Sequence, residues 1–387
     1  MIRVALLTEI ISPYRVPVFN HLARDPRIEL RVLFLAETED RRSWRVPRSE
    51  IRFPFHVLPG RVVARTYQRA PLFLNPGVIS HLRRGRYDVI ICGGYQHPTY
   101  WLTLLYCKLA RKRALLWTES NRRDTRSGNR AKNVYKRLLI GLYDGYIAAG
   151  SAQKEYLSDF GIDPDRIWTA PNAVDNHFFA RRASAQRPIK EKLKDELGIK
   201  GQVVLYVGRL LDAKGIPHLL QALERVTKKV DATLVIVGDG PDESKYRVEA
   251  GKRGLPVYFA GFQQQEELSR YYGMADIFVF PTESDQWGLA INEAMASGLP
   301  VIVSSVAGAA SDLVRDGYNG LLFEPGDVPA LAAHIERLLT DRELADRMGQ
   351  ASQRIIEAHS PERCAAGFVE AIIGVCRRGE EANRRCR

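Results

Sequence analysis

The sequence has few cysteines and no long apolar run. Its five cysteines show neither a CxxC pair nor a histidine at metal-ligand spacing, so we expect neither a disulfide scaffold nor a metal site. No segment approaches the roughly 18 uninterrupted apolar residues that a membrane-spanning helix needs. The apolar N-terminus is interrupted by Glu9 and no small-residue cleavage site follows, which indicates a first strand and not a signal peptide. We therefore expect a cytoplasmic protein that is soluble or peripheral.

The second half of the chain has no excess of positive charge, so the net positive charge of the protein lies in the first half. Residues 1–180 hold 29 Lys and Arg against 16 Asp and Glu, a net charge of +13, whereas residues 181–387 hold 28 against 29. A basic surface confined to one half indicates an anionic partner there, which is a membrane leaflet, a phosphate-bearing substrate or a nucleic acid. The densest basic stretch precedes the apolar run LLIGLY and comprises Arg122, Arg123, Arg126, Arg130, Lys132, Lys136 and Arg137. This stretch fits either a helix on a membrane surface or a solvated helix whose apolar side packs in the core.

The rest of the composition is that of an ordinary globular protein. Hydrophobic residues make up 45% and charged residues 26%, which excludes a collagenous or wholly disordered chain. At about 150 residues per domain, the length predicts two to three domains. Short apolar runs alternate with segments of helical spacing, a pattern typical of doubly wound α/β domains with parallel sheets. The expected buried strands are residues 4–8, 30–36, 88–92, 113–119, 145–150, 202–209, 233–240, 256–261, 276–281 and 299–305.

The series of strands is interrupted once, and this divides the chain. Residues 1–180 form the expected N-terminal domain and residues 201–359 a second α/β domain, with the polar and charged residues 181–200 as a linker. Pro361 follows a serine that suits the N-cap of a helix. We expect this last helix, about residues 360–387, to pack back on the first domain. Because open α/β sheets bind ligands outside the carboxyl ends of their strands, the loops after strands are the candidate sites.

The segment at residues 281–302, PTESDQWGLAINEAMASGLPVI, predicts a strand end, an acidic loop and a helix. Gly288 lies where the loop turns into a helix that begins at Leu289, so unpaired N–H groups and the positive end of the helix dipole are available for a phosphate. Asp285 and Glu293 flank this turn. A carboxylate accepts two hydrogen bonds from a vicinal diol, so the pair suits a ligand with hydroxyls on either side of its phosphates. The alternative is a turn residue and an acid on a solvated helix face.

Two cations follow the first strand of the same domain, in the segment YVGRLLDAKG. Gly208 permits close backbone approach, and Arg209 and Lys214 can converge on one pyrophosphate. The alternative is an exposed loop with ordinary basic residues. Because the loop ends a strand, the geometry of the sheet directs it at the ligand-binding edge.

Together these motifs resemble a known family. The chain contains, in the family's order, GRLLDAKG, VGDGP, AGF, ADIFVFPTESDQWGLAINEAMASGLPVI and DGYNGLLFEPGD. From about residue 200 to 330 it resembles the second domain of retaining family 4 glycosyltransferases, the glycosyl transferases group 1. The resemblance implies the GT-B fold, in which two Rossmann-like doubly wound domains face a central cleft. It also implies transfer of a sugar from a nucleotide donor with retention at the anomeric carbon, with no bound metal and no cofactor.

The resemblance carries roles over to single residues of the second domain. Arg209 and Lys214 would hold the donor pyrophosphate, and Glu293 would hold the ribose diol. The first acid of the family's E-x7-E pattern is a glutamate. Asp285 stands at that position here, one methylene shorter, to contact the donor sugar. The implied donor-binding residues are Gly208, Arg209, Lys214, Asp285, Gly288, Leu289 and Glu293.

The first domain resembles the family less closely, and ISPYRVPVF after the first strand is its clearest piece. Many members have a glycine-rich loop there, whereas this chain has Tyr14 and Arg15, of which Arg15 could supply a charge. Members often place a histidine after the strand equivalent to RALLWTES. This chain has Glu119, which either replaces that histidine or leaves the role absent. The histidines His21, His81, His97, His177 and His218 have no partner that the sequence reveals and are interpreted as surface or structural residues. The acceptor-side candidates are Tyr14, Arg15, Arg122 and Arg123.

The favoured interpretation is an enzyme, a retaining hexosyltransferase with a UDP- or GDP-sugar donor. Its acceptor is expected to be lipid-linked or membrane-associated, in cell-surface polysaccharide or glycolipid synthesis at the inner face of the plasma membrane. The catalytic candidates are Arg209, Lys214, Glu119 and Asp285. A second interpretation keeps the fold and glycosylates a soluble small molecule. A third, a basic nucleic-acid-binding α/β protein, is disfavoured because the acidic pair would repel phosphates of a nucleic acid.

Overall fold

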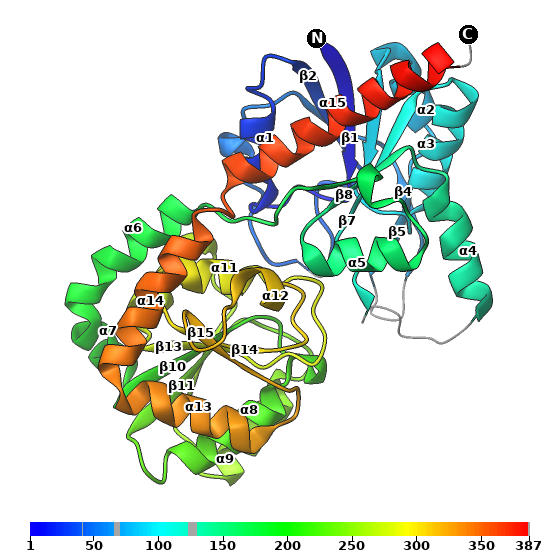
Figure 1. Ribbon diagram of the computed structural model, residues 1–387. Coiled ribbons are helices and arrows are strands. Elements are labelled where there is room, and N and C mark those ends of the chain that lie inside the picture. The colour runs from blue at the N-terminus through cyan, green and yellow to red at the C-terminus, as the bar shows by residue number, and fades with distance from the viewer. Residues whose placement is uncertain (41, 66–69, 123–129, 386–387) are drawn as a thin grey trace. The chain divides into compact units, whose positions relative to one another are not determined.

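The computed structural model describes residues 1–40, 42–65, 70–122 and 130–385, which form two compact units (Figure 1). Unit 1 comprises Met1–Asn172 and Pro361–Arg387, and unit 2 comprises Ala173–Ser360. Each unit has a parallel sheet covered by helices. The prediction of two doubly wound α/β domains is therefore confirmed.

Seven parallel strands form the sheet of unit 1. In spatial order they are β3 (Phe55–Val57), β2 (Ile28–Phe34), β1 (Ile2–Thr8), β6 (Val89–Cys92), β7 (Arg113–Thr118), β8 (Gly145–Ala148) and β9 (Ile167–Thr169). Val4 of β1 lies opposite Leu30 of β2 on one side and Val89 of β6 on the other. The five strands expected in this half are all present. A separate antiparallel pair consists of β4 (Arg61–Arg65) and β5 (Pro71–Leu74).

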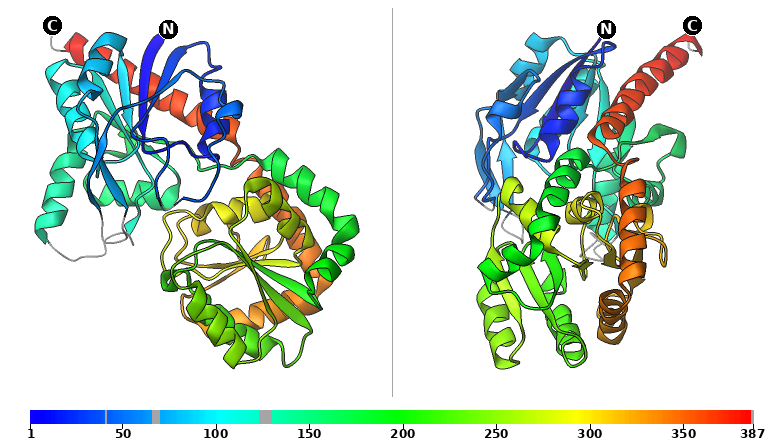
Figure 2. Two further views of the ribbon diagram at one scale, coloured as in Figure 1. Left: turned by 180° about the vertical axis from the view of Figure 1, so that it is seen from behind. Right: turned by 90° about the vertical axis from the view of Figure 1, so that its left-hand side faces the viewer.

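Helices cover both faces of this sheet (Figure 2). They are α1 (Arg15–Leu22), α2 (Val78–Gly85), α3 (Pro98–Leu109), α4 (Arg130–Gly141), α5 (Ser151–Asp159) and α15 (Pro361–Arg385), with short 3-10 turns at Arg48–Glu50 and Pro164–Arg166. On one face α15 packs along α1 and over β7, β8 and β9, where Phe368 meets Trp117 edge-on with ring centroids 5.1 Å apart. On the other face α2 and α3 bury Val78, Leu82 and Leu104 against the strands.

Six parallel strands form the sheet of unit 2. In spatial order they are β12 (Val257–Gly261), β11 (Ala232–Val237), β10 (Gln202–Val207), β13 (Ile277–Phe280), β14 (Val301–Ser304) and β15 (Gly320–Phe323). Its helices are α6 (Asn176–Gln186), α7 (Lys190–Leu197), α8 (Ile216–Val226), α9 (Glu243–Lys252), α10 (Gln265–Met274), α11 (Leu289–Ala296), α12 (Ala310–Leu313), α13 (Val328–Thr340) and α14 (Arg342–Ile356), with 3-10 turns at Arg187–Ile189 and Asp212–Lys214. On one face α8 packs against α13, and on the other α11 packs against α6 and α14.

The predicted linker at residues 181–200 is wrong, and so is the domain boundary at residue 180. Unit 2 begins at Ala173, and α6 and α7 belong to it because both pack against α10. Their polar composition reflects helices with a single buried face, on which Phe179 and Leu193 lie in contact with the protein interior. The last helix, α15, belongs to unit 1.

In both sheets the first strand in chain order lies in the interior, and later strands are added on one side and then on the other. In unit 1 the chain runs from β1 to β2 and β3 on one side, then returns to β6 and continues to β9 on the other. In unit 2 it runs from β10 to β12, then returns to β13 and continues to β15. The switch points therefore lie between β1 and β6 and between β10 and β13. Open α/β sheets bind ligands outside the carboxyl ends of the strands at such points.

Of the helices in the described residues, none is long and apolar enough to cross a membrane.

Candidate active site

In unit 2, the loops that follow β10 and β13 lie in close backbone contact at the switch point. Gly215 has a φ of +72°, and a Cβ atom there would lie 1.9 Å from the carbonyl oxygen of Pro281. Only glycine combines this backbone conformation with such close approach. The N–H of Glu283 also donates to the carbonyl oxygen of Ala213 at 3.0 Å. The two loops that carry the predicted donor-binding residues are therefore neighbours.

Lys214 and Asp285 form an ion pair across this switch point. Lys214 Nζ lies 2.5 Å from Asp285 Oδ2 and 3.1 Å from the carbonyl oxygen of Ser284. The other carboxylate oxygen of Asp285 accepts the N–H of Trp287 at 3.1 Å. The two side chains are 19% and 20% exposed. Two residues that the sequence assigned to one site thus come together, in a place that a ligand can reach.

The start of α11 lies beside Asp285 in the chain. Gly288 precedes the helix with a φ of +100°, and a Cβ atom there would lie 2.9 Å from the ring of Phe280. A glycine is therefore required for this entry into the helix. The first N–H groups of a helix have no intrahelical partner and carry the positive end of its dipole. From Leu289 onward, α11 offers an anion site at the carboxyl edge of the sheet.

Glu293 lies in the second turn of α11 and is buried, with 1% of its surface exposed. The hydroxyl of Tyr272 in α10 donates to its Oε2 at 2.6 Å. The alternative interpretation of a solvated helix face is therefore wrong.

Arg209 lies in the loop after β10 and is half-buried, and its carbonyl oxygen accepts the hydroxyl of Tyr206 at 3.0 Å. Gly208 joins Arg209 to the strand, and its N–H donates to the carbonyl oxygen of Val237 at 3.0 Å.

In unit 1, Arg15 and Glu119 form an ion pair with each other. Arg15 Nη1 also donates to Asn172 Oδ1 at 2.9 Å, and the guanidinium lies over the ring of Trp117, 4.4 Å from its centroid. Burial lowers the pKa of Arg15 to about 10, so the group stays charged at neutral pH. Its charge is balanced by Glu119, and the pair ties α1 to the end of β7.

Among the remaining acceptor-side candidates, Arg122 and Tyr14 make contacts with other residues. Arg122 donates from Nε and Nη2 to both carboxylate oxygens of Asp159, at 2.6 and 2.8 Å, and the guanidinium holds the pKa of that carboxyl below its usual value. Arg123 lies outside the described residues. Tyr14 precedes α1 and meets the ring of Trp44 edge-on, with centroids 6.5 Å apart.

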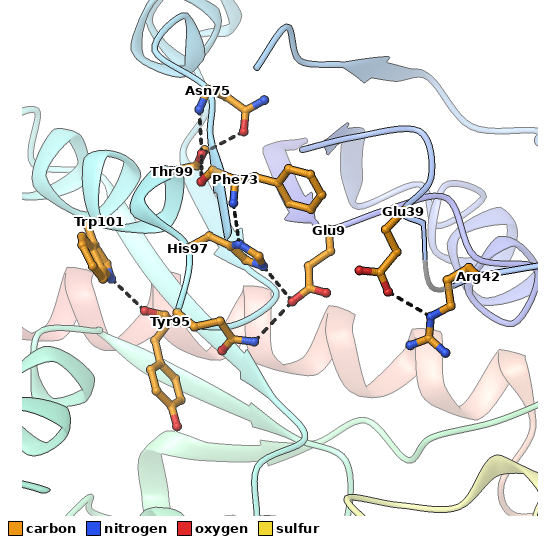
Figure 3. Close-up of polar contacts among 10 residues, drawn as sticks. Glu9, Glu39, Arg42, Phe73, Asn75, Tyr95, His97, Thr99 and Trp101 are labelled. Atoms are coloured by element: carbon orange, nitrogen blue, oxygen red, sulfur yellow. Dashed lines mark hydrogen bonds and ion pairs between the residues drawn. The ribbon is translucent and has the colours of Figure 1, made fainter. Parts of the chain in front are cut away.

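The structure also shows a polar cluster that the sequence analysis missed, at the switch point of unit 1 (Figure 3). Glu9 directly follows β1, and His97 follows β6 at the start of α3. His97 Nε2 lies 2.9 Å from Glu9 Oε1, and Gln96 Nε2 lies 3.3 Å from the same oxygen. On the other side of the ring, Nδ1 of His97 accepts the N–H of Phe73 at 3.1 Å. The only signal in the sequence was the position of both residues after predicted strands.

Within the described parts of the chain, no three His, Cys, Asp or Glu side chains gather so as to hold a metal ion. Cys92, Cys107 and Cys364 are buried thiols. Burial raises the pKa of Cys107 and of Cys364 to about 12. These two thiols are therefore protonated at neutral pH, and we assign them no chemistry.

The two units correspond to two domains of one enzyme family. Residues 189–355 match the family described as Glycosyl transferases group 1, and residues 20–178 match Glycosyltransferase Family 4. The chain therefore belongs to the family 4 glycosyltransferases of GT-B fold. The resemblance inferred from the sequence motifs is confirmed.

Individual relatives support the same family. The chain is 34% identical over 217 residues to the sulfoquinovosyl transferase SQD2 of Arabidopsis thaliana, covering 55% of this chain and 39% of that protein. It is 37% identical over 198 residues to a GDP-mannose-dependent alpha-mannosyltransferase of Corynebacterium glutamicum, covering 50% and 44%. The chain thus spans less than half the length of these two relatives. The fold is shared with HepE of Anabaena in complex with UDP and glucose, at a TM-score of 0.75, 20% identity and coverage of 96% and 99%.

Proposed function

We propose that the protein is a retaining hexosyltransferase that uses a UDP- or GDP-sugar and a lipid-linked or membrane-associated acceptor. Its role would be the synthesis of a cell-surface polysaccharide or glycolipid at the inner face of the plasma membrane. The main support for a nucleotide-sugar donor is the Lys214–Asp285 ion pair at the switch point of unit 2, next to the start of α11. A relative that depends on GDP-mannose and a fold neighbour that binds UDP support a nucleotide-sugar donor.

The ion pair suits the junction between the diphosphate and the sugar of such a donor. An ammonium group has three N–H donors, whereas an ionised carboxylate only accepts hydrogen bonds. Lys214 can therefore keep its bond to Asp285 and also bind a phosphate oxygen. Asp285 would then accept a hydroxyl of the donor sugar. Glu293, in the second turn of α11, would accept the hydroxyls of the ribose.

The chemistry that these groups supply is stabilisation of the leaving diphosphate. Arg209, Lys214 and the positive end of α11 place positive charge where negative charge develops in the transition state. In a transfer on one face of the sugar, the departing diphosphate can take the proton of the acceptor hydroxyl, and the protein positions the reactants. We therefore propose a reaction that requires neither a metal ion nor a cofactor.

Nucleotide binding tests the donor site directly. We expect either the uracil or the guanine nucleotides to raise the melting temperature, equally with and without excess EDTA. At a ligand concentration of 100 times Kd, the gain in unfolding free energy is about 2.7 kcal/mol. Arg209→Ala and Glu293→Gln should lose this gain, measured by differential scanning fluorimetry. Arg247→Ala, which removes an exposed guanidinium from α9, is the control. Absence of stabilisation by every nucleotide would contradict the donor site.

The exposed faces of α3 and α4 form a surface that suits a membrane, here called the α3–α4 surface. Its large apolar side chains are 42–78% exposed and are Trp101, Leu105, Leu109, Val134, Tyr135, Leu138 and Leu142. Trp101 and Tyr135 join the two helices, with ring centroids 6.4 Å apart. Ile140 and Leu139 of α4 do pack in the core, as the alternative interpretation expects, whereas Val134, Tyr135 and Leu138 of the same helix are exposed. Basic residues in or next to these two helices are Lys108 and Arg111 at the end of α3, and Lys136 and Arg137 in the middle of α4.

Apolar side chains surrounded by basic ones favour an anionic leaflet as the partner of this surface. Apolar side chains enter the headgroup boundary, and each basic residue near an anionic surface adds about 1 kcal/mol. This supports an acceptor held at the membrane. The surface belongs to unit 1, the half of the chain with the excess positive charge.

Vesicle flotation tests the α3–α4 surface. We expect binding to vesicles that contain phosphatidylglycerol, weakened by salt because screening acts on exposed charges, and no binding to pure phosphatidylcholine. The double variant Leu105→Asp, Leu138→Asp should lower the bound fraction about tenfold or more, since charged groups are costly in the bilayer. Val248→Asp, at a 56% exposed position of α9 in unit 2, is the matched control. If the wild-type protein binds neither kind of vesicle, the acceptor is a soluble molecule and the membrane proposal fails.

A further inference from the structure

The loop after β11 contains the segment VGDGP, residues 237–241, to which the donor site assigns no role. The N–H of Leu210 donates to the carbonyl oxygen of Asp239 at 2.8 Å, so this loop lies against the loop after β10. The chain then enters α9 at Glu243. The segment therefore joins the loop that holds the two predicted donor cations to the start of α9.

Asp212 connects α9 to the donor loop through three partners. Its carboxylate accepts Lys245 Nζ at 2.7 and 2.8 Å, one bond to each oxygen, and the hydroxyl of Tyr246 at 2.9 Å. The N–H of Asp212 donates to Oδ2 of Asp242, the residue before α9, at 2.9 Å. Both the side chain and the backbone of Asp212 are thus held by residues at the start of α9.

Tyr246 is the most firmly packed member of this group. Its ring is fully buried in the core of unit 2, and packing of this kind locks a side chain in one rotamer. Lys245 and Asp212 are 54% and 59% exposed, and an ion pair this exposed adds little to the stability of a fold. Hydrogen bonds from Lys245 and Tyr246 hold the pKa of Asp212 below its usual value, so the carboxylate is ionised at neutral pH. The group therefore fixes a position more than it stabilises unit 2.

Lys214 is the last residue of the short 3-10 turn that Asp212 begins. The N–H of Gly215 closes the turn on the carbonyl oxygen of Asp212 at 2.8 Å. Because the hydrogen bonds of 3-10 turns have poor geometry, contacts from outside decide where such a turn lies. On the β13 side, the carbonyl oxygen of Ala213 accepts the hydroxyl of Thr282 at 3.2 Å. On the α9 side, the contacts are those of Asp212.

Arg209, the other predicted donor cation, is held by different bonds. Its carbonyl oxygen accepts the hydroxyl of Tyr206 at 3.0 Å. The next residue, Leu210, is bonded to the loop after β11 through its N–H at 2.8 Å and its carbonyl oxygen at 3.2 Å. These bonds do not involve the side chain of Asp212. Loss of the Asp212 carboxylate should therefore displace Lys214 and leave Arg209 in place.

We propose that Asp212, held by Lys245 and Tyr246, is a positioning residue that sets the place of Lys214 against the diphosphate of the donor. This inference rests on the proposed function, in which Lys214 binds a phosphate oxygen. A displacement of about 1 Å in a group that acts on the transition state can lower a rate about 100-fold. Asp212 affects the reaction only through Lys214.

Donor turnover by the full-length protein, with UDP-glucose and GDP-mannose as donors, tests this role. Asp212→Ala should lower kcat about 10- to 100-fold and change KM less than about threefold. Asp212→Asn keeps an oxygen that accepts the hydroxyl of Tyr246 and should retain most of the turnover. Unchanged kcat in Asp212→Ala overturns the proposal.

Glu336→Ala is the matched control for this experiment. Glu336 accepts Lys229 Nζ at 2.9 Å on each of its two oxygens, in the same unit, and the lysine side chain is 64% exposed. The two bonds join α13 to the residues after α8, away from the donor loop. The control variant should therefore leave kcat unchanged, and a loss equal to that of Asp212→Ala overturns a specific role for Asp212.

A double variant separates positioning of Lys214 from a general effect on the fold. If Asp212 acts through Lys214, Asp212→Ala costs no further turnover once Lys214 is methionine, because residues that act as a unit are not additive. A purely structural loss would multiply with that of Lys214→Met. We expect kcat of Lys214→Met and of the double variant to agree within about twofold. A further loss beyond that overturns the positioning role.

Hydrogen exchange tests the position of the turn without a donor. Exchange of the Lys214 and Gly215 amides measures how often the turn opens, and Asp212→Ala should speed it about tenfold or more while the amides of β10 stay unchanged. Faster exchange supports this inference even if the wild-type protein turns over neither donor, and in that case only the proposed function fails. Unchanged exchange in Asp212→Ala overturns the inference.

Discussion

Replacement of Lys214 by methionine is expected to lower donor turnover on the order of 10²- to 10³-fold, the usual cost of removing one group that stabilises developing negative charge. Methionine keeps the length and apolar stem of the side chain and removes only the cation. The loss should appear mainly in kcat, because the diphosphate carries more charge as the bond to the sugar breaks. Release of free UDP or GDP from the sugar nucleotide, with and without acceptor, measures it.

A matched ion pair in the same unit serves as the control. Lys190 Nζ lies 2.5 Å from Asp276 Oδ1, with side chains 21% and 30% exposed, so its geometry is close to that of the Lys214–Asp285 pair. Asp276, however, precedes β13 and lies at the amino end of the strand. Lys190→Met should therefore cost similar stability and leave turnover unchanged. Equal losses of turnover in Lys190→Met and Lys214→Met would refute a specific role for Lys214.

Replacement of Glu119 by alanine is expected to lower the free energy of unfolding by about 1–3 kcal/mol, because it leaves a largely buried charge, 12% exposed, without a partner carboxylate that is itself 30% exposed. That charge is Arg15, whose pKa burial lowers to about 10. Asn172 and the ring of Trp117 remain, but neither carries a compensating negative charge. Urea denaturation, with hydrogen exchange of the β7 amides as a local measure, checks the effect.

A double variant then decides what Glu119 does in the reaction. Replacing a buried ion pair by apolar residues of similar volume is often neutral for stability, so Arg15→Met with Glu119→Leu should recover most of the loss. A stable and active double variant would make the pair structural. A stable but inactive one would give Glu119 or Arg15 a part in catalysis. A change below about 0.5 kcal/mol in Glu119→Ala would contradict the buried-charge argument.

The long buried strands were predictable because each is a continuous apolar run. The edge strands β3, FHV, and β9, IWT, were not predicted, since they have three residues each and are only half-buried. The segment at residues 181–200 was mistaken for a linker for a related reason. In α7 only Leu193 and Lys194 are buried, so its composition is that of an exposed segment although its packing is that of a helix on unit 2.

The donor residues were predictable because their motifs are local. Gly208, Arg209 and Lys214 lie in one loop, and Asp285 and Gly288 in another, and each loop follows a strand that the sequence reveals. The pairs of unit 1 are different. Glu9 meets His97, and Arg15 meets Glu119, only because β1, β6 and β7 are neighbours, and this order of strands is not contained in any local pattern.

The packing of α15 on unit 1 affects the order in which the protein can fold during synthesis. The residues of α15 follow the whole of unit 2 in the chain, yet Phe368 covers Trp117 in unit 1. At the usual 5–20 residues per second, translation of the 188 residues of Ala173–Ser360 takes roughly 10–40 s. During that time the first sheet lacks α15, and the part of Trp117 that Phe368 contacts stays uncovered. Unit 2 is a single continuous segment and can complete its own core before α15 completes that of unit 1.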